Sequence, residues 1–372
     1  MPGSPTVLSD GVVTLRGHTA ADVDDVLAMA TDPETMRWTS TPRPYERADA
    51  QRWIHETAPA GWADGTAFRW AVAGADGRFA GNLDVHPGPR APSVGFGLAP
   101  WARGAGLMSR ALRLAARWSF EEAGLPVLHW WAQAGNLASW RVAHACGFRF
   151  EGIRRLSVRR GDGDLSDGWF ASLVANGPLT PRTRWWPVPV LDGERVRLRP
   201  HTEADLPRIV ESCSDPQARH FLPGLPHPYT EADARAFVLG ARLGESLGQR
   251  VTWAVADRDD DRMLANVAVF DLDDVFAPTG GEIGYWAHPD ARGRGVVSEA
   301  VGLVVTHAFT PEPVGGLGRH RLEIGAAWSN VASRKVAERA GFTLTGRRRM
   351  AGIVGVGSEQ ALDDGAGYER LA

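Results

Sequence analysis

Cysteine and long apolar runs are both scarce in this chain. The 372-residue sequence contains two cysteines, Cys146 and Cys213, which is too few for a disulfide framework and fits a reducing compartment. No apolar run reaches the roughly 18 residues that a transmembrane helix needs. The first residues, Met1-Pro2-Gly3-Ser4-Pro5, lack the charged start and apolar stretch of a secretory signal. We therefore expect a cytoplasmic protein with no membrane partner.

A surplus of basic charge is also absent. Lys and Arg number 41 against 44 Asp and Glu, which gives a formal net charge of −3. A general nucleic-acid binder would carry a basic face, so we expect no nucleic-acid partner. The 11 histidines show no metal-type spacing, and we expect no metal. A content of 44% hydrophobic and 23% charged residues is that of an ordinary globular protein.

What the chain does have is a long internal repeat. Residues 13–22 and 196–205 are identical at seven of ten positions. Further pairs follow in the same order: Asp32-Pro33 with Asp215-Pro216, Pro44-Tyr45 with Pro228-Tyr229, and Gly147-Phe148 with Gly341-Phe342. The copies lie roughly 190 residues apart, far beyond the 20–50 residues of a solenoid repeat. Each copy is therefore predicted to be a domain, with residues 1–176 and 192–372 joined by a proline-rich linker at 177–191.

Apolar alternation, helix caps and turns predict the same order of elements in both copies. Each copy reads as a strand, two helices, three strands, a long helix, a strand, a helix and two strands. The first helix is expected to stop at Asp32-Pro33 or Asp215-Pro216, because the residue before proline avoids the helical region. This order predicts an α+β (mixed αβ) fold in each copy, with a mixed sheet of about seven strands flanked by helices.

A glycine-rich turn precedes the long helix in each copy. The turn reads Arg103-Gly104-Ala105-Gly106 before Leu107, and Arg292-Gly293-Arg294-Gly295 before Val296. A helix N-terminus offers unpaired N–H groups and a partial positive charge, and glycine allows close approach of the backbone, so the pattern suits an anion. It is neither a P-loop nor a dinucleotide fingerprint, because Gly-Lys-Ser/Thr and the third glycine are absent. A purely structural turn is the alternative.

Taken together, these elements resemble the GNAT superfamily of acyl-CoA-dependent N-acyltransferases, and within it the RimJ/RimL-type branch. The second copy carries the matching segments Ile283-Gly284-Tyr285-Trp286, Ser298-Glu299-Ala300, Asn330-x-x-Ser333 and Ala340-Gly341-Phe342. The resemblance covers nearly the whole chain, once per half. One departure is that Trp101 and Asp290 stand where the family's turn usually begins with Gln or Arg. Because Asp290 would disfavour a pyrophosphate, the backbone amides and Arg292 would have to make that contact.

The resemblance implies acetyl-CoA as the cosubstrate in each half. The pyrophosphate would lie on the amides of 103–108 and 292–297. The pantetheine arm would lie where the fourth and fifth strands of a mostly antiparallel sheet splay apart. Asn136 and Asn330 would bind that arm or hold the splayed strand, whereas helix N-capping is the alternative role. The implied cofactor-binding residues are Arg103, Gly104, Ala105, Gly106, Leu107, Asn136, Arg292, Gly293, Arg294, Gly295, Val296 and Asn330.

Acyl transfer to an amine needs a proton acceptor, donors for the oxyanion and a proton for the leaving thiolate. Ser139 and Ser333 match the family serine that is taken to serve the thiolate, although both could simply cap helices. Glu282 is the candidate base, and its counterpart in the first copy is Ser93. Asp84 of the first copy stands at the position where the second copy has Ala268. Each carboxylate could also be an ordinary polar residue of a strand edge.

Aromatic residues in the loops before the second helix are predicted to form the acceptor wall. They are Trp38 and Tyr45 in the first copy and Phe221 and Tyr229 in the second. Aromatic side chains suit an amine or a peptide N-terminus, and packing of a lid is the alternative. Because only the second copy has Glu282, we expect that copy to carry the main activity.

Two functions from different classes remain open at this point. The first is an N-acetyltransferase that transfers acetyl from acetyl-CoA to a primary amine, either a protein N-terminus or a small molecule, by direct attack through a tetrahedral intermediate. The second is an acyl-CoA-binding or scaffold protein in which one or both copies are inactive. The chain could be a monomer or a dimer, and the two copies could form a pseudo-dimer within one chain.

Overall fold

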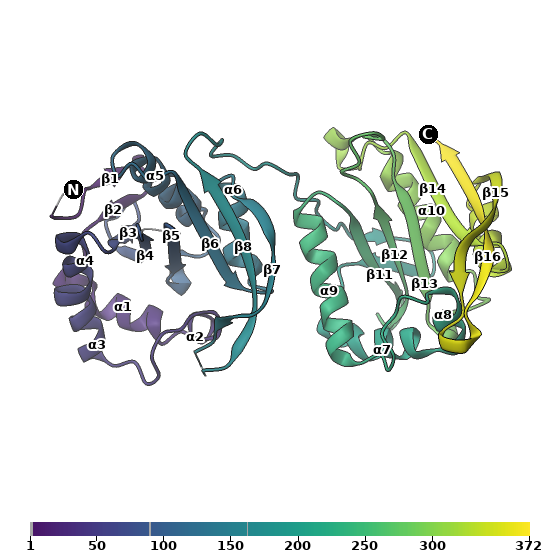
Figure 1. Cartoon of the computed structure of the whole chain (residues 1–372), viewed down its shortest axis with the longest axis horizontal. Helices are drawn as coiled ribbons and strands as arrows, with labels where there is room; N and C mark the ends of the chain where they lie inside the picture. The colour runs from purple at the N-terminus through teal and green to yellow at the C-terminus, as the bar shows by residue number, and fades with distance from the viewer. Residues whose placement is uncertain (1–2, 89–90, 162) are drawn as a thin grey trace. The chain divides into compact units, whose positions relative to one another are not determined.

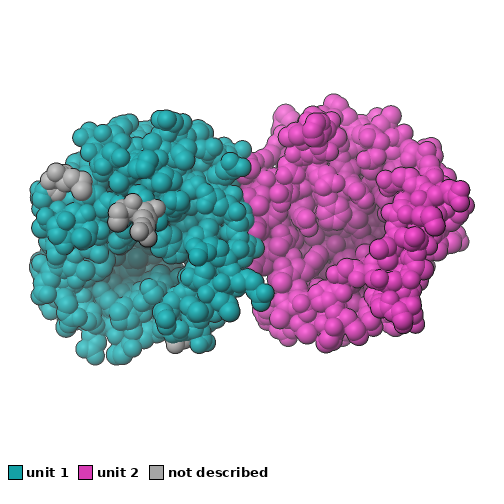
Figure 2. Space-filling view, viewed as in Figure 1, with its two compact units in different colours: residues 1–182 teal, residues 183–372 magenta. Residues whose placement is uncertain are grey.

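The chain folds as two compact units in a computed structural model that describes residues 3–88, 91–161 and 163–372 (Figure 1). Unit 1 comprises residues 1–182 and unit 2 comprises residues 183–372, which Figure 2 colours separately. The division falls inside the segment predicted as a linker. Each unit is described by itself below.

Unit 1 begins with two short strands and a group of helices, and most of its sheet follows. Its elements are β1 (Leu8–Ser9), β2 (Thr14–Arg16), α1 (Val23–Ala30), α2 (Pro33–Trp38), α3 (Arg47–Arg52), α4 (Ala58–Asp64), β3 (Phe68–Ala73), β4 (Phe79–His86), β5 (Ser93–Leu98), α5 (Leu107–Glu121), β6 (Val127–Gln133), α6 (Leu137–Ala145), β7 (Arg149–Arg159) and β8 (Leu165–Val174). A π-helical segment, Trp53–Thr57, joins α3 to α4.

Unit 2 repeats this order with a single long helix in place of α3 and α4. Its elements are β9 (Leu191–Asp192), β10 (Val196–Arg199), α7 (Leu206–Ser214), α8 (Pro216–Phe221), α9 (Glu231–Ser246), β11 (Val251–Asp257), β12 (Met263–Phe270), β13 (Glu282–Ala287), α10 (Val296–Phe309), β14 (Arg321–Ala327), α11 (Val331–Arg339), β15 (Thr343–Val354) and β16 (Ala361–Leu371). The hairpin of β15 and β16 is the yellow edge of this unit in Figure 1.

The described residues of each unit form one eight-stranded sheet, with the orders β1-β2-β3-β4-β5-β6-β8-β7 and β15-β16-β14-β13-β12-β11-β10-β9. All neighbours are antiparallel except β5 with β6 and β13 with β14. Each parallel pair meets at one position only, Ser93 with His129 and Glu282 with Glu323. The strands therefore diverge beyond that point. The predicted mixed sheet is confirmed, and the two-residue strands β1 and β9 raise the expected seven strands to eight.

Helices cover both faces of each sheet. In unit 2, α10 and α11 pack on one face through a core that contains Trp253, Val267 and Ile283. The other face is covered by α7 and α9, whose side chains pack on Ala254 and Met263. Unit 1 has the same arrangement, and α1 and α3 pack on Ala71 and Phe79. We call the second face the α7–α9 face in unit 2 and the α1–α4 face in unit 1.

The short helices α2 and α8 were not predicted from the sequence. The first helix of each unit does end just before the Asp-Pro pair, as expected. Asp32 and Asp215 then cap a new helix, since their Oδ2 atoms accept from Thr35 N at 2.9 Å and Ala218 N at 3.1 Å. Proline is tolerated at the first helical position, where its missing N–H has no partner to lose. The same Asp-Pro pair thus separates two helices.

The segment predicted as a linker is held by hydrogen bonds at both ends. Toward unit 1, Arg182 Nε donates to Gly147 O at 2.8 Å, and Leu179 O accepts from Arg113 Nε at 3.1 Å. Toward unit 2, Trp186 is 4% exposed and belongs to the core, and its Nε1 donates to Gly248 O at 2.9 Å. Residues near Trp186 are therefore part of unit 2.

Candidate functional site

The glycine turn adopts the same left-handed conformation in both units. The φ angles are +79° at Gly104 and +73° at Gly106, and +72° at Gly293 and +78° at Gly295. Gly106 and Gly295 stand at the N-cap positions of α5 and α10, and no side chain caps either helix. The first-turn N–H groups therefore remain free to donate to a ligand. A residue with a side chain would be strained at these φ values.

A cavity of about 1020 Å³ begins at this turn in unit 2. It passes between the diverging strands β13 and β14 and ends on the α7–α9 face. Of the predicted cofactor residues, Arg292, Gly293, Gly295, Val296 and Asn330 line it. Arg294 is not among the lining residues. The cavity therefore joins the glycine turn to the middle of the sheet.

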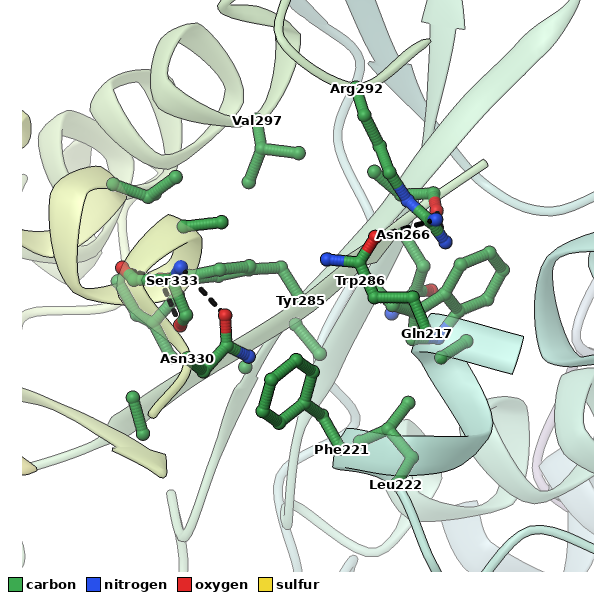
Figure 3. Close-up of a pocket in the computed structure, with 18 of the residues that line it drawn as sticks. Gln217, Phe221, Leu222, Asn266, Tyr285, Trp286, Arg292, Val297, Asn330 and Ser333 are labelled. Atoms are coloured by element: carbon green, nitrogen blue, oxygen red, sulfur yellow. Dashed lines mark hydrogen bonds between the residues drawn. The ribbon is translucent and has the colours of Figure 1, made fainter. Parts of the chain in front are cut away.

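Asn330 and Ser333 meet at the start of α11. Asn330 Oδ1 accepts from Ser333 N at 3.0 Å (Figure 3), so this asparagine caps the helix. Both residues also line the cavity. Helix capping and ligand binding, the two roles that the sequence left open for Asn330, are thus compatible. The cap uses the side-chain oxygen and leaves the NH₂ group for a ligand.

Tyr285 is a site residue whose side chain was missed by sequence reasoning, which considered only its backbone. Its hydroxyl lies 3.0 Å from Ser333 Oγ and 3.0 Å from Ser333 O. Figure 3 shows the Tyr285 ring pointing toward Ser333. Burial raises the pKa of Tyr285 to about 12, so the phenol keeps its proton near neutral pH. The pair therefore places two hydroxyl groups in the wall of the cavity.

Arg103 and Arg292 are held by the short helices rather than left free for an anion. Arg292 donates to Asp215 Oδ2 at 2.6 Å and Gln217 Oε1 at 2.9 Å. Arg103 donates to Asp32 Oδ2 at 2.5 Å and Thr35 Oγ1 at 3.1 Å. Each aspartate offsets the added positive charge. The expected pyrophosphate contact of Arg292 stays a prediction, and in this structure its guanidinium ties α8 to the glycine turn.

The expected repulsion between Asp290 and a bound pyrophosphate is offset by the partners and position of this carboxylate. Its carboxylate pairs with Arg208 at 2.8 Å and with His288 Nδ1 at 2.8 Å, and it does not line the cavity. The hydrogen bond from Arg208 is the largest of the causes that lower the pKa of Asp290 to about 2. The negative charge is thus neutralised on the α7 side of the turn.

Glu282 lies at the point where β13 and β14 meet. The residue is exposed as a whole and is not among the residues that line the cavity. Its Oε1 lies 3.1 Å from the place where a Cβ on the lining residue Gly325 would stand. Partial desolvation, followed by the charge of Asp271, raises the pKa of Glu282. The carboxylate therefore borders the cavity rather than projecting into it.

Aromatic residues form the wall of the cavity on the α7–α9 face. Phe221 and Tyr229, both predicted, line it. Phe237, Phe270 and Trp286 line it as well and were missed, because only the fold brings their three elements together. Two polar atoms on this face, Thr252 Oγ1 and Asn266 Oδ1, are buried without a hydrogen-bond partner in the part of the chain that is described. The cavity thus ends in an apolar pocket with unfilled polar positions.

The predicted residues of unit 1 have different surroundings. Asn136 caps α6 through Ser139 N at 3.1 Å, as in unit 2, but Ser139 Oγ accepts from Trp130 Nε1 at 3.1 Å. Phe96 occupies the strand position of Tyr285 and has no hydroxyl. Trp38 Nε1 donates to Glu34 on its own helix at 3.0 Å, and Tyr45 packs against the core under α1. Lid packing thus describes Tyr45 better than a substrate wall does.

Three further findings concern metal ligands, helix length and cysteine. Among the described residues, no group of three or more His, Cys, Asp or Glu side chains could hold a metal ion. Within the same ranges, no helix is both long and apolar enough to cross a membrane. Cys146 and Cys213 are both free and buried.

A split mixed sheet, a glycine turn opening a long helix, and a cavity that joins the two define an acyl-CoA-dependent transferase fold. The sequence matches the acetyltransferase (GNAT) domain over residues 13–149 and again over 195–343. The chain therefore belongs to the GNAT acetyltransferase family, with one family domain in each unit. This confirms the family and the enzyme class that the sequence predicted.

Individual relatives match parts of the chain. The Bacillus subtilis (strain 168) protein named probable N-acetyltransferase YjcK is 37% identical over 90 residues, which is 24% of this chain and 46% of that protein. The match thus spans about half the length of this curated relative. An acetyltransferase from Salmonella typhimurium that modifies the N-terminal serine of ribosomal protein L7/L12 is 21% identical, with a TM-score of 0.41, over 50% of this chain and 99% of that chain. The microcin C7 self-immunity acetyltransferase MccE, solved with acetyl-CoA and AMP, is 17% identical, with a TM-score of 0.40, over 48% of this chain and 94% of that chain.

Proposed function

We propose that unit 2 transfers an acetyl group from acetyl-CoA to a primary amine that carries an apolar group. The observation that carries this proposal is the continuous cavity of about 1020 Å³, which joins the glycine turn, the Tyr285–Ser333 pair and the aromatic wall. An acyl donor needs the glycine turn and the Tyr285–Ser333 pair, and an acceptor needs the aromatic wall. Family membership supports the reaction class, and the cavity supports this choice of unit.

The cofactor is placed by backbone groups more than by side chains. The N–H groups of residues 293–297 suit a pyrophosphate, because they converge at a helix N-terminus, whereas the N–H of Arg292 already donates to Pro289 O. Beyond Glu282, the edges of β13 and β14 that face each other have no ladder partner. An extended pantetheine arm can hydrogen-bond to those edges, and the Asn330 side-chain NH₂ group can donate to it. This arrangement would bring the thioester beside Tyr285 and Ser333.

The reaction then follows from the groups that line the cavity and from Glu282 at its border. The amine loses its proton to Glu282, directly or through water, and its lone pair attacks the thioester carbon. Backbone N–H groups near 285–287 donate to the oxyanion of the tetrahedral intermediate. When the intermediate collapses, the C–S bond breaks and the thiolate takes a proton from the Ser333 hydroxyl. The nitrogen gives up its second proton as the amide forms, and this proton restores the Ser333 hydroxyl. Tyr285 can relay it, since its hydroxyl lies 3.0 Å from Ser333 Oγ.

The acceptor pocket favours an amine with an apolar neighbour. Its walls are Phe221, Phe237, Phe270 and Trp286. The unpartnered Thr252 Oγ1 and Asn266 Oδ1 can accept N–H groups from the acceptor. A hydrophobic peptide N-terminus and an arylalkylamine both have this combination of groups, and an acceptor panel distinguishes them.

Thiol release from acetyl-CoA with a panel of amines tests the proposal. We expect Glu282→Gln to lower kcat about 100-fold, in the range typical of general base removal, and Ser333→Ala to lower it by tenfold or more. Ser329→Ala is the matched control, because this exposed serine lies just before α11 and outside the cavity. Unchanged turnover in both the Glu282 and the Ser333 variants would disprove the assignment. Binding of acetyl-CoA without turnover of any amine would favour the acyl-CoA-binding alternative.

A further inference from the structure

The α1–α4 face of unit 1 holds polar residues where unit 2 has its apolar pocket. The register of β3 with β4 matches that of β11 with β12, because Phe68 pairs with Val85 as Val251 pairs with Val269. Arg69 opposite Asp84 therefore corresponds to Thr252 opposite Ala268. One step further along the same face, His86 corresponds to Phe270. The three residues of unit 2 all line its cavity.

Two of these polar residues have buried atoms with no hydrogen-bond partner. Asp84 Oδ1 and Arg69 Nε are both shielded from solvent and unsatisfied within the described ranges. Arg69 is fixed at its other end, since Nη1 donates to Thr57 O at 2.9 Å and the guanidinium lies 5.4 Å from the centre of the Trp53 ring. Buried polar groups are normally paired, and an unpaired donor beside an unpaired acceptor points to a ligand with both functions.

There is room for such a ligand beside Asp84. Gly95 lies directly opposite Asp84 on β5, is exposed, and has no atom within 4 Å of the place where a Cβ would stand. At the corresponding Gly284 in unit 2, the Phe270 ring lies 2.5 Å from that place. Replacing Phe270 by His86 thus leaves this position open in unit 1, next to the strand that would present the thioester.

We propose that unit 1 holds a second acceptor site, which takes an amine bearing a carboxylate, with Asp84 accepting from the amine and Arg69 donating to the carboxylate. The geometry matches an α-amino acid, in which the ammonium and carboxylate groups are attached to the same carbon. The site would use the same acyl donor as the proposed function, but it does not depend on the identity of the acceptor in unit 2. The two units would then acetylate different amines.

The chemistry balances with the residues present. Desolvation raises the pKa of Asp84 to about 7, which suits a group that must take a proton from an ammonium ion near neutral pH. The amine nitrogen bonds to the acetyl carbon, the C–S bond breaks, and the leaving thiolate takes a proton from the Ser139 hydroxyl. The second proton that the nitrogen gives up as the amide forms restores this hydroxyl. Trp130 Nε1 already donates to Ser139 Oγ, so the hydroxyl proton is free to point elsewhere.

The test compares pairs of acceptors that differ only in the carboxylate. The full-length Glu282→Gln/Ser333→Ala double variant silences unit 2, and thiol release is measured with alanine and ethylamine, leucine and 3-methylbutylamine, and phenylalanine and 2-phenylethylamine. We expect an amino acid to be acetylated at least tenfold faster, as kcat/KM, than its partner without the carboxylate. No amino-acid turnover, or equal turnover of both members of every pair, would overturn the proposal.

Variants of the two polar residues separate their roles. Arg69→Gln should raise KM for the amino acid at least tenfold with a smaller change in kcat, and Asp84→Asn should lower kcat at least tenfold. Arg47→Gln is the matched control, because Arg47 pairs with Asp24 on the surface. Asp84→Glu should recover part of the activity, which excludes misfolding as the cause. Amino-acid turnover that is unchanged in both the Arg69 and the Asp84 variants would overturn the assignment. Failure of the proposed function appears separately, as apolar-amine turnover that survives the silencing of unit 2.

Discussion

Units 1 and 2 share a framework and differ in the chemistry it presents. Both have the same strand order, the same left-handed glycine turn, the same Asn-to-Ser helix cap and the same Asp–Arg pair beneath the turn. On the acceptor side, however, unit 2 has Thr252, Ala268 and Phe270 where unit 1 has Arg69, Asp84 and His86. The features proposed to position acetyl-CoA are therefore retained in both copies, whereas the surface proposed to receive the second substrate differs.

The sharpest way to examine this difference is to remove the buried carboxylate of unit 1. The pKa of Asp84 is raised by desolvation to about 7 in the folded state, against an ordinary value of 3.8. Because the folded-state pKa lies above the unfolded one, Asp84 costs stability increasingly between pH 4 and 7 and in full above pH 7. Asp84→Asn should therefore stabilise unit 1 at pH 8, with about 4 kcal/mol as an upper limit, and change little at pH 4. Urea unfolding at both pH values measures this, and the same gain at both would contradict the pKa.

A backbone change should show whether both units bind the cofactor. Gly104→Val and Gly293→Val each introduce a β-branched residue at positive φ, at places where a Cβ would meet no neighbour. The strain of about 1–3 kcal/mol should weaken acyl-CoA binding in the altered unit by roughly 10- to 100-fold. Calorimetric titration should then show one tight site instead of two per chain. A single site in the unaltered protein would show that only one of the two glycine turns binds acyl-CoA.

The hydroxyl pair distinguishes the two units at the thiolate. Tyr285→Phe removes the partner of Ser333 and should lower turnover of an apolar amine by about two- to tenfold, because one hydrogen bond of about 0.5–1.5 kcal/mol is lost. The reverse change in unit 1, Phe96→Tyr, should not raise turnover by that unit, since Trp130 Nε1 already donates to Ser139 Oγ. Steady-state kinetics of both variants measure this. An equal loss of turnover from both would mean that the pair acts only through packing.

The smallest effect is expected at the arginines that both units share. Arg103→Gln and Arg292→Gln remove partly exposed ion pairs with Asp32 and Asp215, worth about 1 kcal/mol or less. The hydrogen bonds from the arginines help to lower the pKa of both aspartates, so this stability is present above the unfolded pKa of 3.8 and is lost as pH falls below it. Thermal unfolding should therefore show a smaller difference between variant and unaltered protein at pH 3 than at pH 7. A drop in acyl-CoA affinity beyond the loss of stability would restore a direct role for Arg292.

Much of the fold was readable from the sequence because it depends on local alternation. The predicted order of strands recurs in both units, apart from the added short strands β1 and β9, and the repeat itself supplied the domain count. The helices α2 and α8 were missed because an Asp-Pro pair both ends one helix and caps the next. The family motifs placed the glycine turns and the Asn-to-Ser caps within the correct elements.

The parts that were missed depend on pairing between distant strands. The contact of Tyr285 with Ser333 spans 48 residues, and no local pattern gives it. Asp84 was recognised as a candidate base, but its relation to Arg69 follows only from the register of β3 with β4. The engagement of Arg103 and Arg292 by aspartates requires the unpredicted helices. Candidate residues could therefore be named from the sequence, whereas their partners could not.

The buried position of Trp186 has a practical consequence for dissecting the chain. A cut at residue 192, where the sequence placed the start of the second domain, would remove this indole from the core and leave a cavity beneath Gly248. Loss of a buried tryptophan costs about 3–5 kcal/mol, which is enough to unfold many domains. A fragment beginning at Thr183 keeps the indole and its hydrogen bond, so recombinant expression of unit 2 alone should start there.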